Sequence, residues 1–175
     1  MLCVMLMATM GCAHHTLPQP PADASSRWAV PGESAPEFAL PSIDGGSFRL
    51  SSYSGRVVIV TFWGTFCRPC RDELRELNLL LVRHRDVIVL AVSLDDDDSN
   101  ESVRKVAAQI HLSFPILRDP SGHVAFTYMK VAMTPFTAIV GRDGRLRAVH
   151  RGYSPSLPRL IEEEVQTALT NPAGT

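Results

Sequence analysis

The sequence lacks an excess of charge of either sign. It also lacks an apolar run as long as a membrane-spanning helix, which needs about 20 residues. Its 175 residues include 17 Lys and Arg and 18 Asp and Glu, which gives a formal net charge of −1. Phosphate recognition needs basic residues concentrated on one face, so the composition argues against a nucleic-acid partner. Hydrophobic residues make up 45% of the chain, which is typical of one globular domain with a tail.

The four cysteines fall into two groups that need separate explanations. Cys3 and Cys12 lie in or beside an apolar start that is long enough for the core of a signal peptide. Residues 1–11 are therefore predicted to be a signal peptide. Gly11 before Cys12 resembles the end of a bacterial lipoprotein signal, in which the cysteine becomes the lipidated first residue. Thr9 stands where that pattern has an aliphatic residue, and the alternative is a wrongly assigned start codon.

Residues 12–34 are predicted to form a flexible tether, because they are rich in Pro, Ala and Ser and show no periodicity. Residues 35–172 then form one domain, which is large enough to hold its own core. Lipid on Cys12 would attach this domain to a membrane surface without spanning the membrane.

Strands and helices alternate in the predicted domain. The β-branched and aromatic run over 57–63 indicates a central buried strand, and leucines at helical spacing follow Cys70. The βαβ alternation indicates an α/β fold. Strands are expected over 38–40, 43–50, 57–63, 87–92, 114–117, 134–140 and 146–150, and helices after Cys70, over 99–110 and over 157–169.

Four successive aspartates, Asp95 to Asp98, precede Ser99, which is a predicted N-cap. The ligand spacing and the glycine of an EF-hand calcium loop are absent. The run is therefore interpreted as a solvated loop whose carboxylates are favoured by the helix dipole.

Cys67 and Cys70 are separated by Arg68 and Pro69 and lie where the buried strand gives way to a helix. At this spacing two sulfurs can form a disulfide, and the first thiol lies near unpaired N–H groups at the helix start. The helix dipole and Arg68 favour a thiolate, so the pKa of Cys67 is expected to be below the about 8.5 of a free thiol. Pro69 suits the first turn, where its missing N–H costs nothing. Cys67 is therefore predicted as the nucleophile and Cys70 as the more buried resolving thiol.

Three other interpretations of this cysteine pair fit less well. A zinc site would need two further ligands at a suitable spacing, and the remaining histidines are scattered. Attachment of c-type haem needs a histidine directly after Cys70, where Arg71 stands. A purely structural disulfide would close a very small loop and contribute little loop entropy. Redox catalysis without a metal or another cofactor is therefore predicted.

The segment from Val58 to Glu73, with W-G-T-x-C-x-P-C-R at its centre, resembles the thioredoxin superfamily. It is similar to the TlpA/ResA-like, AhpC/TSA-related branch of membrane-anchored thiol-disulfide oxidoreductases, over roughly residues 31–170. This resemblance implies a thioredoxin-like fold, with a central mixed sheet flanked by helices, an N-terminal hairpin and a central insertion. It also implies that Pro135 is a cis-proline facing the disulfide, where it leaves the adjacent backbone free to pair with a substrate strand.

The resemblance also suggests roles for side chains near the cysteines. Glu73 matches the active-site glutamate of ResA-like proteins, which implies proton exchange with the cysteines. The alternative for Glu73 is an exposed glutamate in the first helical turn. The alternative for Trp63 is an ordinary core aromatic. Phe66 replaces the tryptophan that usually precedes the first cysteine in the family. Residues expected to contact substrate are Trp63, Phe66, Arg68, Pro69 and Thr134.

The predicted function is reduction of disulfides in partner proteins outside the cytoplasm, on the periplasmic side of a bacterial envelope. Cytochrome c maturation is the commonest role that the family implies, and a membrane protein would re-reduce the pair. Because Arg68 stabilises the reduced thiolate, a protein disulfide oxidase is the nearest alternative. A Cu(I) carrier, with His123 or His150 completing the site, is another. A peroxidase is not favoured, because the P-x-x-x-T-x-x-C signature is absent around Cys67.

Overall fold

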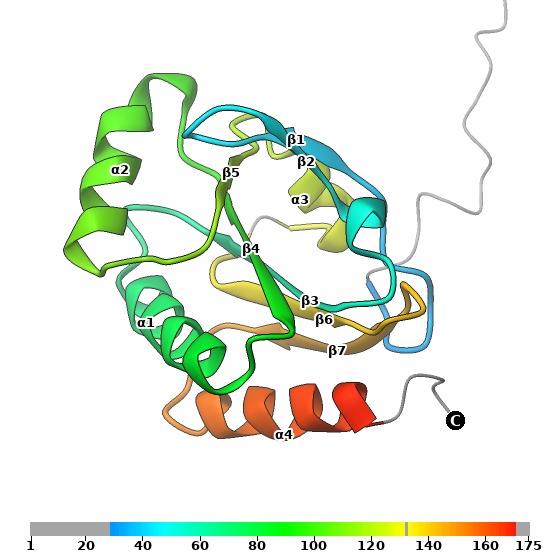
Figure 1. Ribbon diagram of the computed structural model, residues 1–175. Helices are drawn as coiled ribbons and strands as arrows, with labels where there is room; N and C mark the ends of the chain where they lie inside the picture. Colours follow the sequence, from blue (N-terminus) through cyan, green and yellow to red (C-terminus); the bar gives the residue numbers. More distant parts are fainter. Residues whose placement is uncertain (1–28, 132, 171–175) are drawn as a thin grey trace, which may run out of the picture.

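A five-stranded mixed sheet forms the centre of the computed structural model, which describes residues 29–131 and 133–170 (Figure 1). Its strands are β3 (Val57–Trp63), β4 (Val87–Ser93), β5 (Ile116–Arg118), β6 (Phe136–Val140) and β7 (Leu146–Arg151). They lie in the order β5-β4-β3-β6-β7. β3, β4 and β5 run in parallel, whereas β6 is antiparallel to β3 and to β7.

The middle strand, β3, is buried along its whole length. Its alternate residues belong to two different apolar clusters, so that Ile59 and Trp63 face one side of the sheet and Val60 and Phe62 face the other. A strand with both faces covered needs a continuous apolar sequence. The prediction of a central buried strand over 57–63 is thus confirmed.

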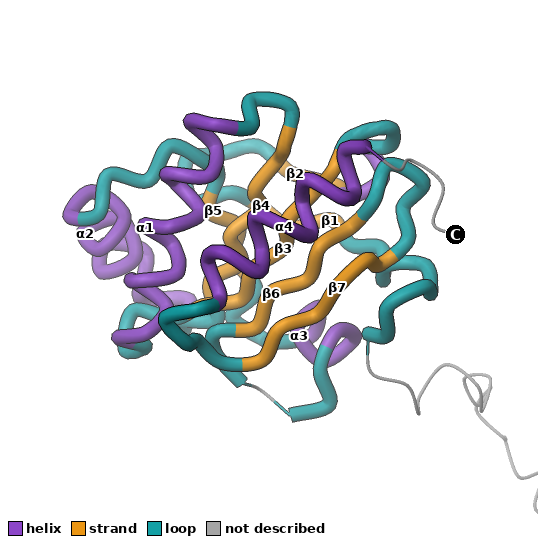
Figure 2. The backbone as a smooth tube through the Cα atoms, turned by 90° about the horizontal axis from the view of Figure 1, so that it is seen from below, coloured by secondary structure: helices purple, strands orange, loops and turns teal. Residues whose placement is uncertain are grey.

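Three helices share the first apolar cluster with one face of the sheet: α1 (Arg68–Arg83), α2 (Asn100–Gln109) and α4 (Leu157–Thr170). Figure 2 shows α4 lying across the sheet from below, with α1 beside it. The buried leucines of α1, Leu74, Leu77 and Leu80, recur at the helical spacing seen in the sequence. This packing fixes the start of α1 against the end of β3.

The opposite face of the sheet is covered by smaller elements. These are the hairpin of β1 (Ala39–Pro41) and β2 (Ser47–Arg49), the 3-10 helix η1 (Leu50–Tyr53) and the short helix α3 (His123–Tyr128). Tyr128 packs its ring against Phe38 and Phe62, and its hydroxyl donates to the carbonyl oxygen of Pro36 at 2.8 Å. The predicted thioredoxin-like arrangement, with a mixed sheet between helices and an N-terminal hairpin, is confirmed.

The domain begins earlier than predicted. Ala29 is buried and donates its N–H to the carbonyl oxygen of Tyr128 at 3.1 Å. Gly32 donates to Leu146 at 2.7 Å, and Ser34 forms a bridge with Arg145. Residues 29–34 therefore belong to the domain and not to the tether, because their backbone groups pair with it. The predicted signal peptide, Cys12 and residues 12–28 of the tether lie outside the described residues.

Three elements were not predicted, and one of them is η1, which directly follows β2. α3 is only six residues long, which is too short for a periodic pattern to stand out. A 3-10 helix, η2 (Asp97–Ser99), precedes α2, and Ser99 is the N-cap without a capping hydrogen bond from its side chain.

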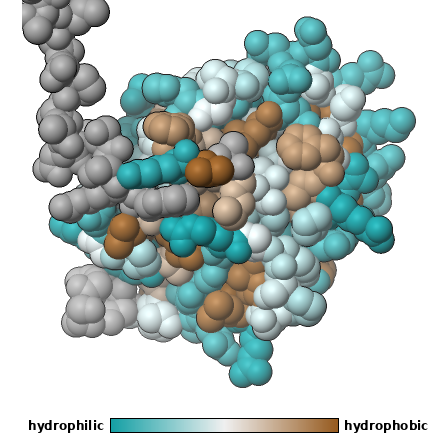
Figure 3. Space-filling model, turned by 180° about the vertical axis from the view of Figure 1, so that it is seen from behind, coloured by the Kyte–Doolittle hydropathy of each residue, from teal (hydrophilic) through white to brown (hydrophobic). Residues whose placement is uncertain are grey.

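The described residues contain no helix that is both long and apolar enough to span a membrane. On the face shown in Figure 3, apolar residues lie in separate groups among hydrophilic ones. That face therefore presents small apolar sites and not a continuous apolar surface.

Candidate active site

The two cysteines lie at the junction that the sequence predicted, where α1 starts after β3. They form a disulfide, with their Cα atoms 5.3 Å apart. Cys67 is the N-cap of α1, and its Sγ accepts the backbone N–H of Cys70 at 3.2 Å. Cys67 is 6% exposed and Cys70 1% exposed, so the second cysteine is the more deeply buried. After reduction, the same N–H group is placed to stabilise a thiolate on Cys67.

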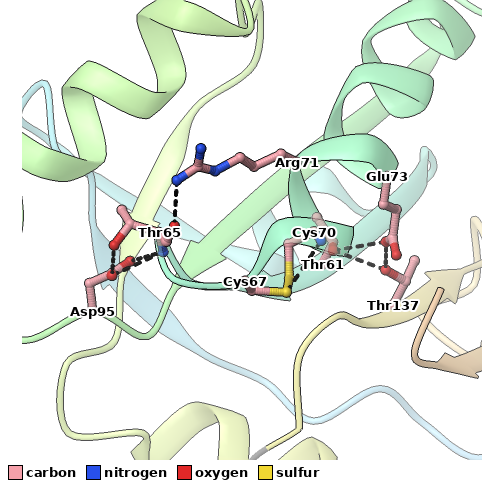
Figure 4. The surroundings of a disulfide bond; sticks show 8 residues. All are labelled: Thr61, Thr65, Cys67, Cys70, Arg71, Glu73, Asp95 and Thr137. Carbon is pink, nitrogen blue, oxygen red and sulfur yellow. Dashed lines mark hydrogen bonds between the residues drawn. A yellow bond between two sulfur atoms is a disulfide. The ribbon is translucent and has the colours of Figure 1, made fainter.

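A buried polar cluster lies on one side of the disulfide (Figure 4). Glu73 follows Cys70 by three residues on α1, so both side chains lie on the same face of the helix. Glu73 Oε1 accepts hydrogen bonds from the hydroxyls of Thr61 on β3, at 3.1 Å, and Thr137 on β6. Within the described part of the chain, Glu73 Oε2 has no hydrogen-bond partner. The two carboxylate oxygens of Glu73 therefore differ: hydroxyl groups hold Oε1, whereas Oε2 keeps its capacity to form a hydrogen bond.

Glu73 is only 2% exposed, which contradicts the alternative of an exposed first-turn glutamate. Burial raises the pKa of Glu73, and the hydrogen bonds from Thr137 and Thr61 and the charge of His150 only partly oppose this rise. A carboxyl group with a raised pKa can accept and return a proton closer to neutral pH than an exposed one. The environment of Glu73 thus suits a group that gains and loses a proton.

A second buried cluster holds the loop before Cys67, on the other side of the disulfide in Figure 4. The Asp95 carboxylate accepts the backbone N–H of Thr65 at 3.0 Å and the hydroxyl of Ser93 at 2.8 Å. Arg71 donates to the carbonyl oxygen of Thr65 at 2.7 Å. Arg118, which is also buried, donates to Ser93 at 2.6 Å. The backbone N–H of Thr65 is thus held by Asp95, and the carbonyl oxygen of Thr65 is held by Arg71.

The interpretation of Asp95 to Asp98 as a solvated loop is wrong for its first member. Asp95 is 6% exposed because it directly follows β4 and turns inward to the loop before Cys67, whereas Asp96, Asp97 and Asp98 are exposed. Four identical residues in a row gave no signal that would distinguish Asp95. The end of β4 next to the Cys67 loop could have done so, because carboxyl ends of adjacent parallel strands share one edge.

The bond between Thr134 and Pro135 is cis, as the resemblance implied. β3 and β6 are antiparallel, with Phe62 opposite Phe136. Pro135 therefore lies at the carboxyl end of β3, on the edge of the sheet that carries the disulfide. Its carbonyl oxygen accepts the N–H of Gly152 at 2.8 Å.

Trp63 and Phe66 differ sharply in exposure. Trp63 is fully buried in the core beneath α1, so the expectation that it contacts substrate is not supported. Phe66 is 76% exposed beside Cys67. Its ring lies over Gly64: a Cβ atom built on Gly64 would approach the Phe66 ring to 2.6 Å. Arg68 and Pro69 are also exposed, and Thr134 is half-buried.

No group of three or more His, Cys, Asp or Glu side chains is placed to hold a metal among residues 29–131 and 133–170. His150, a candidate third ligand for Cu(I), has its Nε2 2.6 Å from Glu164 Oε2. His123 is exposed at the start of α3.

The thioredoxin-like sheet, the Cys-x-x-Cys disulfide at the start of a helix and the cis-proline on the same edge define a thiol-disulfide oxidoreductase. Comparison with known families agrees: the AhpC/TSA family model matches residues 31–149, and the chain belongs to that family.

Its curated relatives include thiol-disulfide oxidoreductases ResA. The protein from Geobacillus kaustophilus is 34% identical over 123 residues, which is 69% of each chain, and that from Bacillus cereus is 27% identical over 143 residues, which is 82% of each. A solved structure of a putative thiol:disulfide interchange protein DsbE from Chlorobium tepidum superimposes with a TM-score of 0.74 at 30% identity. The match covers 80% of this chain and 98% of that one.

Proposed function

We propose that this oxidoreductase reduces disulfides of partner proteins outside the cytoplasm, with Cys67 as nucleophile and Cys70 as resolving thiol. The observation that carries the proposal is the disulfide at the start of α1 with the buried Glu73 three residues beyond it. Once Glu73 is ionised, its negative charge disfavours a thiolate on the nearby cysteines, so it makes the reduced pair less stable. A pair whose reduced form is not strongly stabilised is a reductant, whereas the strongly oxidising DsbA stabilises its reduced form.

The reaction proceeds through a mixed disulfide. The Cys67 thiolate attacks one sulfur of the partner disulfide, and the other partner sulfur leaves as a thiolate. Cys70 then loses its proton and attacks Cys67 Sγ, which releases the second partner sulfur. Two electrons pass to the partner, and the Cys67–Cys70 disulfide of this structure is formed.

Glu73 accepts the proton of Cys70 in this proposal. Its Oε2 is the atom without a partner among the described residues, and the two threonine hydroxyls hold Oε1. The raised pKa of Glu73, which burial causes, brings its proton affinity closer to that of a thiol. The backbone beside Pro135, at Thr134, pairs with the partner chain in this proposal, and Phe66, Arg68 and Pro69 form the surface beside Cys67.

The location and the physiological partner in this proposal rest on the sequence. The apolar start and Cys12 support export and lipid attachment, which incorporation of labelled fatty acid by the wild type and not by Cys12→Ala would test. The family resemblance supports a role in cytochrome c maturation and re-reduction by a membrane protein. Accumulation of oxidised apocytochrome in a deletion strain, reversed by the wild type but not by Cys67→Ser, would test the role.

The direction of electron flow is tested by the reduction potential of the pair. A reductase is expected at about −250 mV or lower, near thioredoxin, and a value near the about −120 mV of DsbA would show an oxidase. The presence of Arg68 favours that second function, so Arg68→Gln is informative: it should lower the potential. Cys70→Ser should trap partners as mixed disulfides, and Cys67→Ser should trap none.

A further inference from the structure

A groove of about 340 Å³ lies directly beside Cys67, and the proposed function does not explain its charge. It is lined by Phe66, Arg68, Arg71, Asp72 and Arg75. The four charged residues occur at helical spacing along one side of α1, and three of them are arginines. The groove therefore carries a formal excess of two positive charges on a chain whose net charge is −1.

The guanidinium groups of the groove are only partly used by the protein itself. Arg75 Nη1 pairs with Asp72 Oδ1 at 2.8 Å, and both side chains are 51% exposed. Arg71 is fixed by its bond to the carbonyl oxygen of Thr65. Arg68 is exposed and has no ion-pair partner among the described residues. Arg68 and Arg75 can each offer a carboxylate two parallel hydrogen bonds, which is the geometry that guanidinium groups favour.

Building on the proposed function, we propose that this groove selects partner segments with an Asp or Glu close to the attacked cysteine. α1 rises about 1.5 Å per residue, so Arg71 and Arg75 lie about 6 and 12 Å along the helix from Cys67. An extended peptide advances about 3.4 Å per residue. A partner chain that runs along the groove thus brings residues about two to four positions from its cysteine to the arginines.

The exposed ring of Phe66 adds an apolar wall to the same groove, next to Cys67 in the chain. The preferred segment therefore has an apolar residue next to the cysteine and an acidic residue beyond it. The exposed Asp96, Asp97 and Asp98 follow β4 and are not among the residues that line the groove.

The test uses the pre-reduced protein and three disulfide-linked peptides that differ only in Glu, Gln or Lys three positions from the attacked cysteine. The readout is the second-order rate constant of disulfide cleavage at low and at physiological ionic strength. The Glu peptide is expected to react about tenfold faster than the Gln peptide at low salt, and added salt should shrink this ratio. The Lys peptide should be slowest.

Two variants of the groove and one control variant distinguish recognition by the groove from an effect of the protein's net charge. In Arg68→Gln with Arg75→Gln, the ratio of Glu to Gln peptide should fall close to one. In Arg68→Glu with Arg75→Glu, the Lys peptide should become the fastest. Arg85→Gln is the matched control, because Arg85 is exposed in the turn between α1 and β4, at the opposite edge of the sheet. It should retain the ratio of the wild type.

Equal rates for the Glu and Gln peptides, with both cleaved, would overturn the groove proposal and leave the reductase standing. No cleavage of any peptide would instead contradict the proposed function. An equal fall of the ratio in Arg85→Gln would assign the effect to net charge and overturn the proposal. The proposal would also be overturned if glutathione disulfide reacted as fast as the Glu peptide and depended on Arg68 and Arg75 in the same way. The groove would then bind a small anionic disulfide and not a partner segment.

Discussion

Replacement of Glu73 by Gln should change how the stability of the oxidised protein depends on pH. Because burial raises the pKa of Glu73, the folded state holds a proton in a pH range where the unfolded state has lost it. Stability that depends on this proton is fully present below the pKa of the unfolded chain, about 4.3, and is lost as the pH rises through the raised pKa of the folded protein.

The size of this effect follows from the number of protons involved. One proton contributes a slope of up to about 1.4 kcal/mol per pH unit to the free energy of unfolding. The glutamine side chain of this variant would retain an oxygen that can accept from Thr61 and Thr137, but it cannot ionise. The stability of Glu73→Gln relative to the wild type should therefore increase as the pH rises from about 4.5 toward neutrality.

Urea unfolding of the oxidised protein at a series of pH values measures this difference. Glu101→Gln removes a carboxylate from an exposed position on α2 and controls for the loss of one charge. Parallel curves of unfolding free energy against pH for the wild type and Glu73→Gln between pH 4.5 and 8 would refute the reasoning, because they would show that Glu73 ionises alike in the folded and unfolded states.

In reduced protein, Glu73→Gln should slow the second step of disulfide exchange by about 100-fold or more, since the acceptor for the Cys70 proton is lost.

Three further predictions concern the surroundings of the site. Asp95→Ala should cost about 1–3 kcal/mol in urea unfolding, because the N–H of Thr65 and the hydroxyl of Ser93 lose their acceptor, and an unchanged midpoint would contradict the role of this cluster. Phe66→Ala should change stability by less than about 0.5 kcal/mol, as the ring is exposed, but should raise KM for partner disulfides with little change in kcat. The hydrogen bond from Arg83 lowers the pKa of Glu162, so Glu162→Gln should cost up to about 1 kcal/mol at pH 7. This cost should disappear as the pH falls below the ordinary range of a glutamate, and a cost that persists at pH 2 would point to packing instead.

The sequence allowed the central strand and the cysteine site to be predicted because both depend on local patterns. The run over 57–63 is continuous and apolar, and Cys67 and Cys70 follow it at once, so their position at a strand-to-helix junction needed no tertiary information. The cis bond before Pro135 came from the family resemblance, since nothing in the residues around it distinguishes the two isomers.

What the sequence could not predict depends on contacts between distant segments. Glu73 is buried because Thr61 on β3 and Thr137 on β6 meet it, and these residues are 12 and 64 positions away. Asp95 turns inward to Thr65, which is 30 positions away. Ala29 is held by Tyr128. In each case a polar group or a short segment is held by a residue far away in the sequence. The spacing of apolar residues along the chain does not identify that residue.

Because the ring of Phe66 lies over Gly64, a substitution at residue 64 would also change the position of that ring. The three atoms nearest to a methyl group at residue 64 would all belong to the ring of Phe66, which is mostly exposed and can swing aside. A substitution there would thus redirect the aromatic wall beside the nucleophile without touching the sulfurs or Glu73. Gly64→Ala should therefore change the relative rates at which different partner disulfides react, while the cysteine pair and Glu73 stay in place.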